Sequence, residues 1–561
     1  MGNSITRRTF IKHSIAGASG ATFLWCLGCS SNPDFDLILV GGLVYDGSGE
    51  QPSQLDIGIK DGRISGLGTL RDKSALRKID VSGLAVAPGF IDFHSHSDDE
   101  LLLGGDPQSK IRQGVTTEVL GQDGDSMAPL TPEMLKKLDE GLQGRYGVSA
   151  DWLDFAGYFA RLEQSGMISN AISMVGQGTL REYAVGPDDR PATEAEVRKM
   201  IDLAQAAFAQ GAYGISSGLE YTPGSFASTD EIAAVCASMK GQGIYSTHMR
   251  NEDDTVVEAL EEAIKIAKWS KSRLNISHMK ASGKRNWDKL YLILENMKTS
   301  RVKGLPITSD RYPYVAYNTG LSSLFPLWSR DGGKDAFVER LRDKSLHPRL
   351  RETVLGKIEK IGGWEAVVVS SIPDNPDRAN LEGRNMADLT AGGKDPFQYL
   401  VDLVLTEDGG GDMVGFAMSE DNTSRLLANP YNMIASDGSA LGTEGKLLRG
   451  VPHPRAFGTF PRVLGKYVRE DGIMSLQEAI RKMTSLPALA LRLKDRGQIR
   501  EGFAADLVAF DAATVIDKAT FKNPHQYPAG IPYVLVNGKV VIDQEAYTGT
   551  LAGRVLRNPV V

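Results

Sequence analysis

The stretch Gly89-Phe90-Ile91-Asp92-Phe93-His94-Ser95-His96 decides the fold that this sequence predicts. The apolar run from Ala85 to Phe93 has the length and composition of a buried strand, and two histidines stand at its end. Because side chains alternate along a strand with a period of two, both imidazoles are expected to point to the same side. Polar side chains at the carboxyl end of a strand are typical of barrel enzymes, whose active sites are built there.

Seven further short apolar runs are expected to form strands. They are Thr116–Leu120, Asn170–Val175, Tyr213–Ser217, Ile244–Thr247, Arg273–Ser277, Leu305–Ser309 and Asn432–Ser436. Between them lie stretches with apolar residues at helical spacing, for example Val197, Met200, Ile201, Ala204 and Phe208. Strands that alternate with helices predict a (β/α)8 barrel over residues 87–496. A doubly wound open sheet is the alternative arrangement of the same elements.

Two other regions do not fit a simple barrel. Residues 318–429 are too long for one barrel connection, so we expect an inserted helical subdomain there. Residues 34–86 contain short alternating strands, with a hairpin signal at Asp61-Gly62, and the same pattern returns in residues 497–561. The two chain ends are therefore expected to pair into one small β-sandwich domain.

The composition excludes some functional classes. Of the 561 residues, 41% are apolar and 24% are charged, which is typical of a globular protein and excludes a disordered or fibrous chain. The formal net charge of −7 argues against a nucleic-acid partner, because phosphate binding requires a concentrated basic surface. Among three cysteines, Cys26 and Cys29 lie in the first thirty residues, so Cys236 has no partner for a disulfide in the folded body.

Residues 1–33 have the features of an export signal. A positively charged start precedes the apolar run Ile15–Gly28, which is shorter than a typical membrane span. The segment Thr6-Arg7-Arg8-Thr9-Phe10-Ile11-Lys12 resembles the twin-arginine export motif, and Leu27-Gly28-Cys29-Ser30 resembles the end of a lipoprotein processing box. We therefore expect an exported protein, either periplasmic or anchored to a membrane through a lipid on Cys29.

Four of the eight histidines stand at predicted strand ends. Besides His94 and His96, these are His248 after the fifth strand and His278 after the sixth, and Asp437 follows the eighth. Imidazole and carboxylate are the ligands of zinc sites that keep an open position for water, so the pattern predicts a catalytic metal site. His13, His347 and His525 lie elsewhere in the sequence, whereas His453 stands in a loop that could line the site.

These residues and others in the same order resemble the N-acyl-D-amino-acid deacylases (D-aminoacylases) of the amidohydrolase superfamily. The matching segments are Pro88–His96, Gln113-Gly114-Val115-Thr116-Thr117, Ser216–Gly224, Thr247-His248-Met249-Arg250, Ile276–Lys280, Asp310-x-Tyr312-Pro313-Tyr314, Ser436-Asp437-Gly438, His453-Pro454-Arg455-x-x-Gly458 and Met483–Ala488. The resemblance covers nearly everything from Asp36 to Arg557. It implies hydrolysis of the amide bond of N-acyl-D-amino acids, with Zn²⁺ as the cofactor.

The resemblance also implies a role for each matching residue. His248 and His278 would hold a tightly bound zinc ion, and His94 and His96 would frame a second metal position. Asp437 would act as general base and then as general acid. Zinc polarises an amide carbonyl and lowers the pKa of water, which explains why this chemistry uses these residue types.

The sequence departs from the family pattern at one ligand. Family members often carry Gly-x-Cys-Gly after the second strand, and that cysteine binds zinc, whereas this chain has Gly121-Gln122-Asp123-Gly124. Asp123 is expected to be a ligand or a bridge, although a carboxylate binds zinc less tightly than a thiolate. No lysine lies in Ala212–Tyr221, so the carboxylated lysine of other amidohydrolases is missing there, and Glu220 is the backup candidate.

Substrate recognition follows from the same resemblance. Lys280, Tyr312 and Arg455 match the family residues that bind the substrate α-carboxylate. Arginine offers two parallel donors to a carboxylate, and lysine and tyrosine each add one, so the chemistry agrees with this role.

Three other functions remain open. One is hydrolysis of dipeptides that contain a D-amino acid, and another is hydrolysis of cyclic amides, as in hydantoinases and dihydroorotases. The third is ligand binding without catalysis by an exported protein. The sequence also leaves open the preferred side chain, the acyl group and the oligomeric state.

Overall fold

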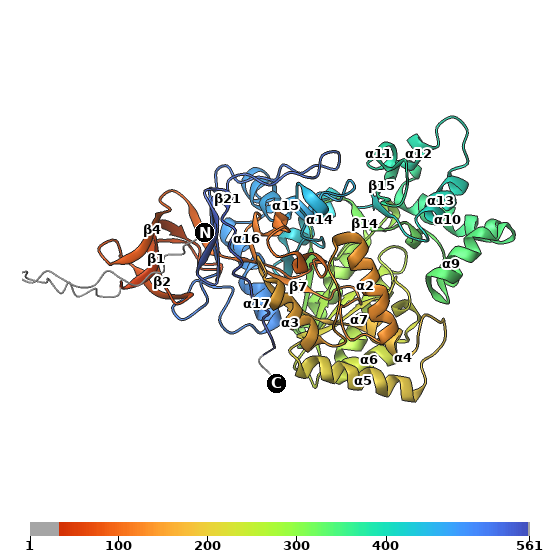
Figure 1. Cartoon of the computed structure of the whole chain (residues 1–561), viewed down its shortest axis with the longest axis horizontal. Helices are drawn as coiled ribbons and strands as arrows, with labels where there is room; N and C mark the ends of the chain where they lie inside the picture. Colours follow the sequence, from red (N-terminus) through yellow and green to blue (C-terminus); the bar gives the residue numbers. More distant parts are fainter. Residues whose placement is uncertain (1–32, 559–561) are drawn as a thin grey trace, which may run out of the picture.

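Parallel strands form the centre of the molecule in the computed structural model, which describes residues 33–558 (Figure 1). These barrel strands are β6 (Phe90–Asp92), β7 (Val115–Leu120), β8 (Asn170–Ser173), β9 (Val175–Gly176), β10 (Gly214–Gly218), β11 (Ile244–His248), β12 (Arg273–Ile276), β13 (Ile307–Arg311) and β17 (Asn432–Ile434). They pair in the order of the chain, as β6-β7-β8 and as β9-β10-β11-β12-β13-β17. A (β/α)8 barrel has its strands in this sequential order, whereas a doubly wound sheet reverses its strand order at a switch point. The observed order therefore agrees with the predicted barrel and not with the alternative.

The ring closes where β17 meets β6. Asp437 N–H donates to the His94 carbonyl oxygen at 2.8 Å, and His96 N–H donates to the Gly438 carbonyl oxygen at 3.2 Å. Ser95 and Gly438 also form an isolated parallel bridge. The closure therefore brings the first and last strand ends, with their histidines and aspartate, next to each other.

Helices cover the barrel and carry the predicted amphipathic pattern. Those outside residues 318–419 are α1 (Gln108–Ile111), α2 (Pro132–Tyr146), α3 (Phe155–Ser165), α4 (Gln177–Ala184), α5 (Glu194–Ala209), α6 (Thr229–Ala237), α7 (Val256–Ser270), α8 (Lys289–Val302), α14 (Glu420–Ala428), α15 (Arg455–Arg462), α16 (Leu476–Met483) and α17 (Ser485–Leu491), with a π-helix at Val463–Glu470. In α5, Met200, Ala204 and Ala207 are buried, and Thr193 and Glu196 form a capping box at its start.

Strands from both chain ends form one nine-stranded sheet, at the end of the molecule near the N label in Figure 1. It contains β1 (Phe35–Val44), β2 (Ser53–Lys60), β3 (Arg63–Gly68), β4 (Ala75–Asp80), β5 (Ala85–Pro88), β18 (Leu507–Phe510), β19 (Tyr533–Val536), β20 (Lys539–Asp543) and β21 (Ala546–Tyr547). Antiparallel pairing of β5 with β18 joins the two ends. The predicted turn between β2 and β3 has positive φ at Asp61 and Gly62, as a tight hairpin requires. The packing of this region as a two-layer sandwich stays a prediction.

Two predicted strands are each divided in the structure. The run Ala85–Phe93 forms β5 in the end sheet and β6 in the barrel, so the predicted boundary at residue 87 falls inside β5. Gly89 lies between the two strands, and a Cβ atom there would lie 2.2 Å from Thr116 Oγ1, so this close approach requires glycine. Likewise Met174 separates β8 from β9. One continuous apolar run does not reveal that it passes from one sheet to another.

The segment between β13 and β17 lies at the opposite end of the molecule from the nine-stranded sheet (Figure 1). The helices at this end are α9 (Gly333–Arg342), α10 (His347–Ile361), α11 (Arg378–Leu381), α12 (Met386–Leu389) and α13 (Pro396–Thr406), whereas α14 of the same segment packs on β13 and β17. The segment also contains an antiparallel sheet that the helical prediction missed, made of β14 (Tyr317–Gly320), β15 (Val367–Ser371) and β16 (Asp412–Gly415). Strands as short and irregular as β14 give no alternating pattern in the sequence. An apolar cluster around Phe337, Leu400 and Met413 is separate from the barrel core.

A buried ion pair locks the closure of the barrel. The Lys110 ammonium donates to Asp92 Oδ2 at 2.6 Å, and Asp92 also accepts bonds from the Ser436 amide at 2.8 Å and hydroxyl at 2.5 Å. All three residues are inaccessible to solvent. Because Asp92 precedes His94 and Ser436 precedes Asp437, this network fixes two strand ends of the site.

Replacing Lys110 with methionine should therefore destabilise the protein strongly. The change leaves the Asp92 carboxylate buried without its cation, which costs about 3–5 kcal/mol of unfolding free energy in comparable cases. Chemical denaturation followed by tryptophan fluorescence measures the shift of the unfolding midpoint. Lys136→Met, which breaks an exposed i,i+4 pair with Glu140, is the control and should leave the midpoint unchanged.

No helix within residues 33–558 is both long enough and apolar enough to span a membrane.

The predicted export signal, with Arg7, Arg8, Cys26 and Cys29, lies outside the described residues except for Pro33. Cys236 is buried in α6 and is a free cysteine.

Candidate metal centre

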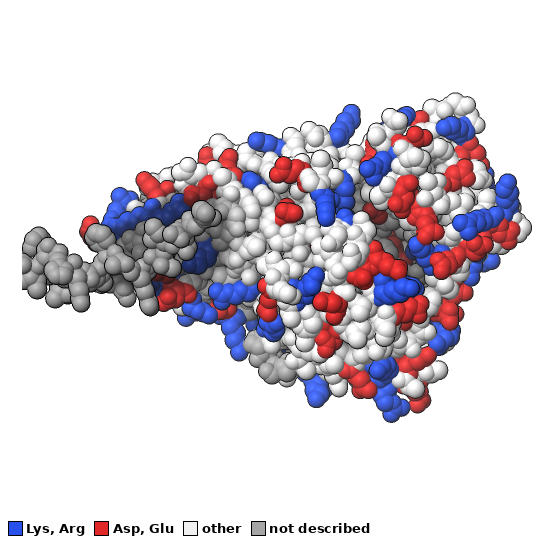
Figure 2. Space-filling model, in the orientation of Figure 1, with Lys and Arg blue, Asp and Glu red and all other residues white. Residues whose placement is uncertain are grey.

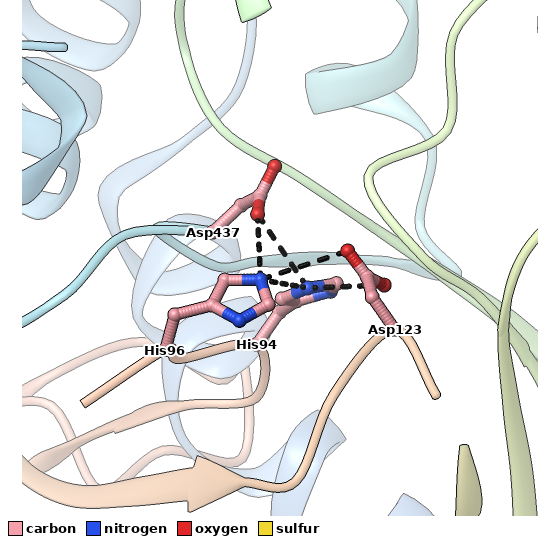
Figure 3. Close-up of side chains that lie close together, drawn as sticks. All are labelled: His94, His96, Asp123 and Asp437. Carbon is pink, nitrogen blue, oxygen red and sulfur yellow. Dashed lines mark hydrogen bonds and ion pairs between the residues drawn. The ribbon is translucent and has the colours of Figure 1, made fainter. Parts of the chain in front are cut away.

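Side chains from five strands, β6, β7, β11, β12 and β17, meet at the carboxyl end of the barrel. Figure 3 shows His94 and His96 after β6, Asp123 after β7 and Asp437 after β17, with both carboxylates directed at the two rings. The ligand atoms of these four residues all lie within 4.8 Å of one another. Asp123 also forms a second group of the same kind with His248 and His278. The structure thus brings the predicted ligands together as two adjoining groups that share Asp123.

The first group is compact. The Nε2 atoms of His94 and His96 are 3.2 Å apart, and Asp437 Oδ1 lies 3.5 Å from the first and 3.2 Å from the second. Asp123 Oδ1 lies 3.4 Å from His94 Nε2. His94 is completely buried, whereas the His96 side chain is 36% exposed and reaches the cavity. Two imidazoles and two carboxylates therefore face one point.

The second group uses the other oxygen of Asp123. Its Oδ2 lies 3.2 Å from His278 Nε2 and 3.7 Å from His248 Nδ1, and these two ring nitrogens are 2.9 Å apart. Oδ2 also lies 3.6 Å from His96 Nε2, so the Asp123 carboxylate faces both histidine pairs, which is the arrangement of a bridging carboxylate.

Left-handed backbone conformations place three of these residues. Asp123, His278 and Asp437 have φ values of 52°, 33° and 52°. Non-glycine residues rarely adopt positive φ, and such strain is concentrated at functional sites. The Asp123 loop also packs so closely on β10 that a Cβ atom at Gly218 would lie 1.9 Å from the Asp123 carbonyl oxygen. Only glycine at position 218 allows this approach.

Two buried carboxylates that the sequence analysis did not assign support the histidines. Asp310 accepts the backbone N–H of His278 at 2.8 Å, and its Oδ1 lies 3.5 Å from His94 Nδ1. Glu252 Oε1 lies 3.0 Å from His278 Nδ1. Carboxylates that contact the outer nitrogen of a metal-binding histidine orient the ring and raise its basicity. Asp310 belongs to the Asp-x-Tyr-Pro-Tyr segment, so the sequence motif could have identified it as a site residue. Glu252 belongs to none of the motifs and could not be identified from the sequence.

The electrostatics of the cluster favour a cation. Burial raises the pKa of Asp123, but the His94 and His278 rings outweigh it and hold that pKa well below the ordinary value. Burial also opposes protonation of His96, yet Asp123 and Asp437 raise the pKa of this ring to about 9. Ionised carboxylates among imidazoles therefore attract positive charge, whether as protons or as a metal ion.

The same atoms fit a metal ion. Asp123 Oδ1, which faces His94 Nε2, is buried and has no hydrogen-bond partner among the described residues. Buried polar atoms are nearly always satisfied, so such atoms indicate a missing partner. Imidazole nitrogens with carboxylate oxygens form a donor set that suits zinc and other divalent transition metals.

Asp437 has a second neighbour besides the histidines. Arg455, the first residue of α15, donates from Nη1 to Asp437 Oδ2 at 2.5 Å, and both side chains are buried. His453 Nδ1 accepts the Arg455 backbone N–H at 3.0 Å, and its Nε2–H donates to the Ala316 carbonyl oxygen at 2.9 Å. Burial and the adjacent Arg455 charge lower the pKa of His453 well below its ordinary value, so this ring stays neutral. His453 therefore lines the site but does not join the ligand groups.

The other predicted substrate residues lie beside the cluster. Lys280 Nζ is 2.6 Å from Glu252 Oε2 and 2.8 Å from His278 Nδ1. Tyr312 is completely buried, its hydroxyl has no hydrogen-bond partner within residues 33–558, and the Arg455 guanidinium lies 4.9 Å from the centre of its ring. Lys280, Tyr312 and Arg455 all line the cavity that holds the ligand groups. Three donors are thus available at one side of the cluster.

The cavity is large and is bounded on its outer side by the segment between β13 and β17. Its volume is about 2200 Å³, and its wall includes residues of this segment as well as Glu220, which follows β10. Figure 2 shows the surface hollowed between this segment and the barrel, with acidic and basic side chains at the rim. Glu220 Oε2 lies 3.7 Å from His248 Nε2, so the backup candidate adjoins the cluster without belonging to either ligand group.

Comparison with protein families and curated proteins finds related hydrolases. The model of the amidohydrolase family matches residues 426–542. The D-aminoacylase of Alcaligenes xylosoxydans xylosoxydans is 39% identical over 94% of this chain and 98% of its own length. The N-acyl-D-aspartate deacylase of the same organism is 34% identical over 93% and 95%, and its N-acyl-D-glutamate deacylase is 33% identical over 93% and 96%.

Two solved structures extend the likeness to three dimensions. A D-aminoacylase structure that concerns the role of a binuclear metal centre has a TM-score of 0.77 and 37% identity, and the match covers 93% of this chain and 100% of that one. The N-acyl-D-glutamate deacylase from Bordetella bronchiseptica, complexed with zinc and a phosphonate inhibitor that mimics the tetrahedral intermediate, has a TM-score of 0.77 and 32% identity. That match covers 93% of this chain and 99% of the other.

Proposed function

This chain belongs to the D-aminoacylase family of the amidohydrolase superfamily, and from this premise we propose that it uses a divalent metal ion to hydrolyse N-acyl-D-amino acids to a carboxylate and a free D-amino acid. The observation that carries the proposal is the buried Asp437 carboxylate, which lies within 3.5 Å of both His94 and His96 at the barrel closure. A base beside a metal centre is what hydrolysis of an unactivated amide requires.

We propose zinc as the metal, held by His248, His278 and Asp123, with His94 and His96 at a second position. Support comes from the donor set and from the zinc complex of the Bordetella bronchiseptica relative. A bound zinc ion supplies Lewis acidity, which polarises an amide carbonyl and makes water easier to deprotonate. Because the Asp123 carboxylate lies within 3.7 Å of all four histidines, this residue is assigned the bridging role that Glu220 would otherwise fill.

The residues of the chain perform the remaining steps. Asp437 accepts a proton from the attacking water and returns it to the leaving nitrogen, so that the amine departs neutral. Arg455 holds the Asp437 carboxylate in place and in its ionised form, because burial raises the pKa of Asp437 but the Arg455, His278 and His94 charges lower it well below its ordinary value. Lys280, Tyr312 and Arg455 bind the substrate α-carboxylate, which positions the amide at the cluster.

Arg455→Ala should reduce activity through both binding and catalysis. The sequence alone assigned Arg455 to binding of the substrate α-carboxylate, but the structure also pairs this guanidinium with Asp437. Removing one partner of a buried charge pair costs about 2–5 kcal/mol, so kcat/KM should fall, with losses in kcat as well as in KM. Steady-state kinetics with an N-acetyl-D-amino acid and with its carboxamide measure the effect. The variant should no longer prefer the free carboxylate, and unchanged kinetics would remove Arg455 from the site.

A substrate panel decides between this function and the alternatives. We expect the zinc-loaded protein to hydrolyse N-acetyl-D-amino acids faster than dipeptides that contain a D-residue, and both faster than hydantoins. The missing lysine on β10 argues against the cyclic amides. Preferential turnover of a hydantoin would overturn the proposal, whereas retained zinc and ligand binding without turnover of any amide would support an exported binding protein.

We further propose that the protein is exported through a twin-arginine signal in residues 1–33 and reaches the periplasm or a membrane anchor on Cys29; the basis is the sequence alone. For the architecture, we propose a small domain of residues 34–86 with 497–561 and an insertion at about 318–429. The shared nine-stranded sheet, which extends to Pro88, supports the small domain, and a separate apolar cluster between Leu321 and Ala417 supports the insertion.

A further inference from the structure

Four cations in the wall of the cavity have no carboxylate partner among the described residues, and two of these, Arg378 and Lys446, are exposed. Arg330 and Lys357 belong to the segment between β13 and β17, and among the described residues neither has a carboxylate oxygen within 4.0 Å. Other cations in the wall are paired in this way: Lys280 with Glu252, Arg455 with Asp437, Lys360 with Asp254 and Arg250 with Glu262. Arg330 and Lys357 are therefore the two unpaired cations of this wall that are not exposed.

Arg330 is also deeply buried. The residue is 8% exposed, its Nε has no hydrogen-bond partner within residues 33–558, and Nη2 makes one long bond of 3.4 Å to the Glu220 carbonyl oxygen. Burial lowers the pKa of its guanidinium, and the nearby Glu220 charge only partly compensates. A buried guanidinium without an anion is costly, so a position of this kind indicates a ligand that supplies the negative charge.

Lys357 adds a second positive charge beside the first. Its ammonium donates to the Ser323 carbonyl oxygen at 2.5 Å, and no carboxylate neutralises it there. Burial lowers the pKa of Lys357, the Glu220 charge offsets only part of this, and the Arg330 charge lowers the pKa further. Two neighbouring cations leave a surplus of charge that one carboxylate would balance, with the guanidinium offering parallel donors and the ammonium a third.

This pair adjoins the metal cluster from the β10 side. Arg330 bonds to Glu220, whose carboxylate lies 3.7 Å from His248 Nε2, and the adjacent Tyr221 ring packs edge-on against His248 at 4.8 Å. The α-carboxylate donors follow β12 and β13 and begin α15, and they line the same cavity. A substrate whose amide lies at the cluster can therefore meet both groups of cations.

We propose that Arg330 and Lys357 form a second anion subsite, which binds an additional carboxylate on the substrate. The inference rests on the proposed function for the identity of the substrate, and it assigns the chain to dianionic N-acyl-D-amino acids. The second carboxylate comes either from an acidic D-side chain, as in D-glutamate, or from a dicarboxylic acyl group, as in succinyl.

Calorimetric binding to the zinc-loaded Asp437→Asn variant tests the subsite without turnover. One ligand pair is N-acetyl-D-glutamate with N-acetyl-D-glutamine, and the other is N-succinyl-D-leucine with its succinamide analogue. In at least one pair the acid should bind at least about tenfold more tightly than the uncharged isostere. The pair that shows the preference identifies the source of the carboxylate.

Variants then assign the preference to the two cations. Introducing Arg330→Met into the Asp437→Asn variant should reduce the preference for the acid to below about twofold. Lys357→Met should also weaken this preference clearly, and it replaces Arg330→Met as the test if that variant fails to fold. Lys334→Met is the matched control, because this exposed cation already pairs with Asp408, and it should leave the preference intact. Equal affinities within both pairs, or a preference that survives both Arg330→Met and Lys357→Met, would overturn the subsite.

Turnover tests the proposed function separately. If wild type hydrolyses N-acetyl-D-glutamine but binds acids and amides equally, the function stands and the subsite falls. If nothing is hydrolysed but the Arg330-dependent preference remains, the subsite stands and the function falls.

Discussion

Asp437→Asn should lower kcat by about 10²–10⁴-fold, the range that a positioned general base contributes. Asparagine keeps the shape of the side chain and can still accept a bond from Arg455, but its amide oxygen cannot take a proton from water. Steady-state turnover of an N-acetyl-D-amino acid measures the loss.

Metal content separates loss of the base from loss of the metal. Asp437 belongs to the group with His94 and His96, whereas the group of Asp123, His248 and His278 does not include it. Zinc measured by plasma mass spectrometry should therefore remain near the wild-type ratio in Asp437→Asn. Wild-type turnover by Asp437→Asn would exclude Asp437 as the base. Loss of zinc from this variant would show instead that Asp437 acts mainly as a metal ligand.

Asp123→Ala should remove both metal binding and activity. Asp123 is the one member common to the two ligand groups, and its carboxylate lies within 3.7 Å of all four histidines. Metal catalysis is worth several kcal/mol of transition-state stabilisation, so kcat/KM should fall at least about 10³-fold. Zinc titration with a chelator as competitor measures the affinity, and the kinetics measure the rate.

Two matched variants sharpen the result. Asp123→Cys supplies the softer thiolate that the resembling family often carries, so it should bind zinc more tightly than wild type. Glu220→Gln changes a carboxylate 3.7 Å from His248 that belongs to neither group, so zinc affinity should change little. Normal zinc binding by Asp123→Ala, or loss of zinc in Glu220→Gln, would transfer the bridging role to Glu220.

The barrel and its ligands could be predicted from the sequence because both depend on local patterns. Apolar runs of strand length alternate with helical periods, and each of His94, His248, His278 and Asp437 follows such a run directly. In a parallel barrel all strand ends meet at one edge, so residues far apart in the sequence must converge there. Asp123 and the substrate-binding residues were assigned from the family resemblance instead, because no periodicity identifies them.

Other features depend on tertiary contacts that leave no local pattern. The division of Ala85–Phe93 between two sheets follows from pairing of β5 with β18, more than 400 residues away in the chain. The sheet of β14, β15 and β16 joins strands from distant parts of the inserted segment. Glu252 and Arg330 could be identified as candidate site residues only from their surroundings. Glu252 contacts His278, and Arg330 is buried with an unpartnered Nε.

The most direct test of metal-dependent deacylation is the release of free amino acid from the two enantiomers of one N-acetyl-amino acid. Protein stripped of metal with a chelator should be inactive, and addition of zinc should restore turnover. The D-enantiomer should then be hydrolysed at least about a hundredfold faster than the L-enantiomer. Equal rates for the two enantiomers, or undiminished turnover by the metal-free protein, would contradict the assignment.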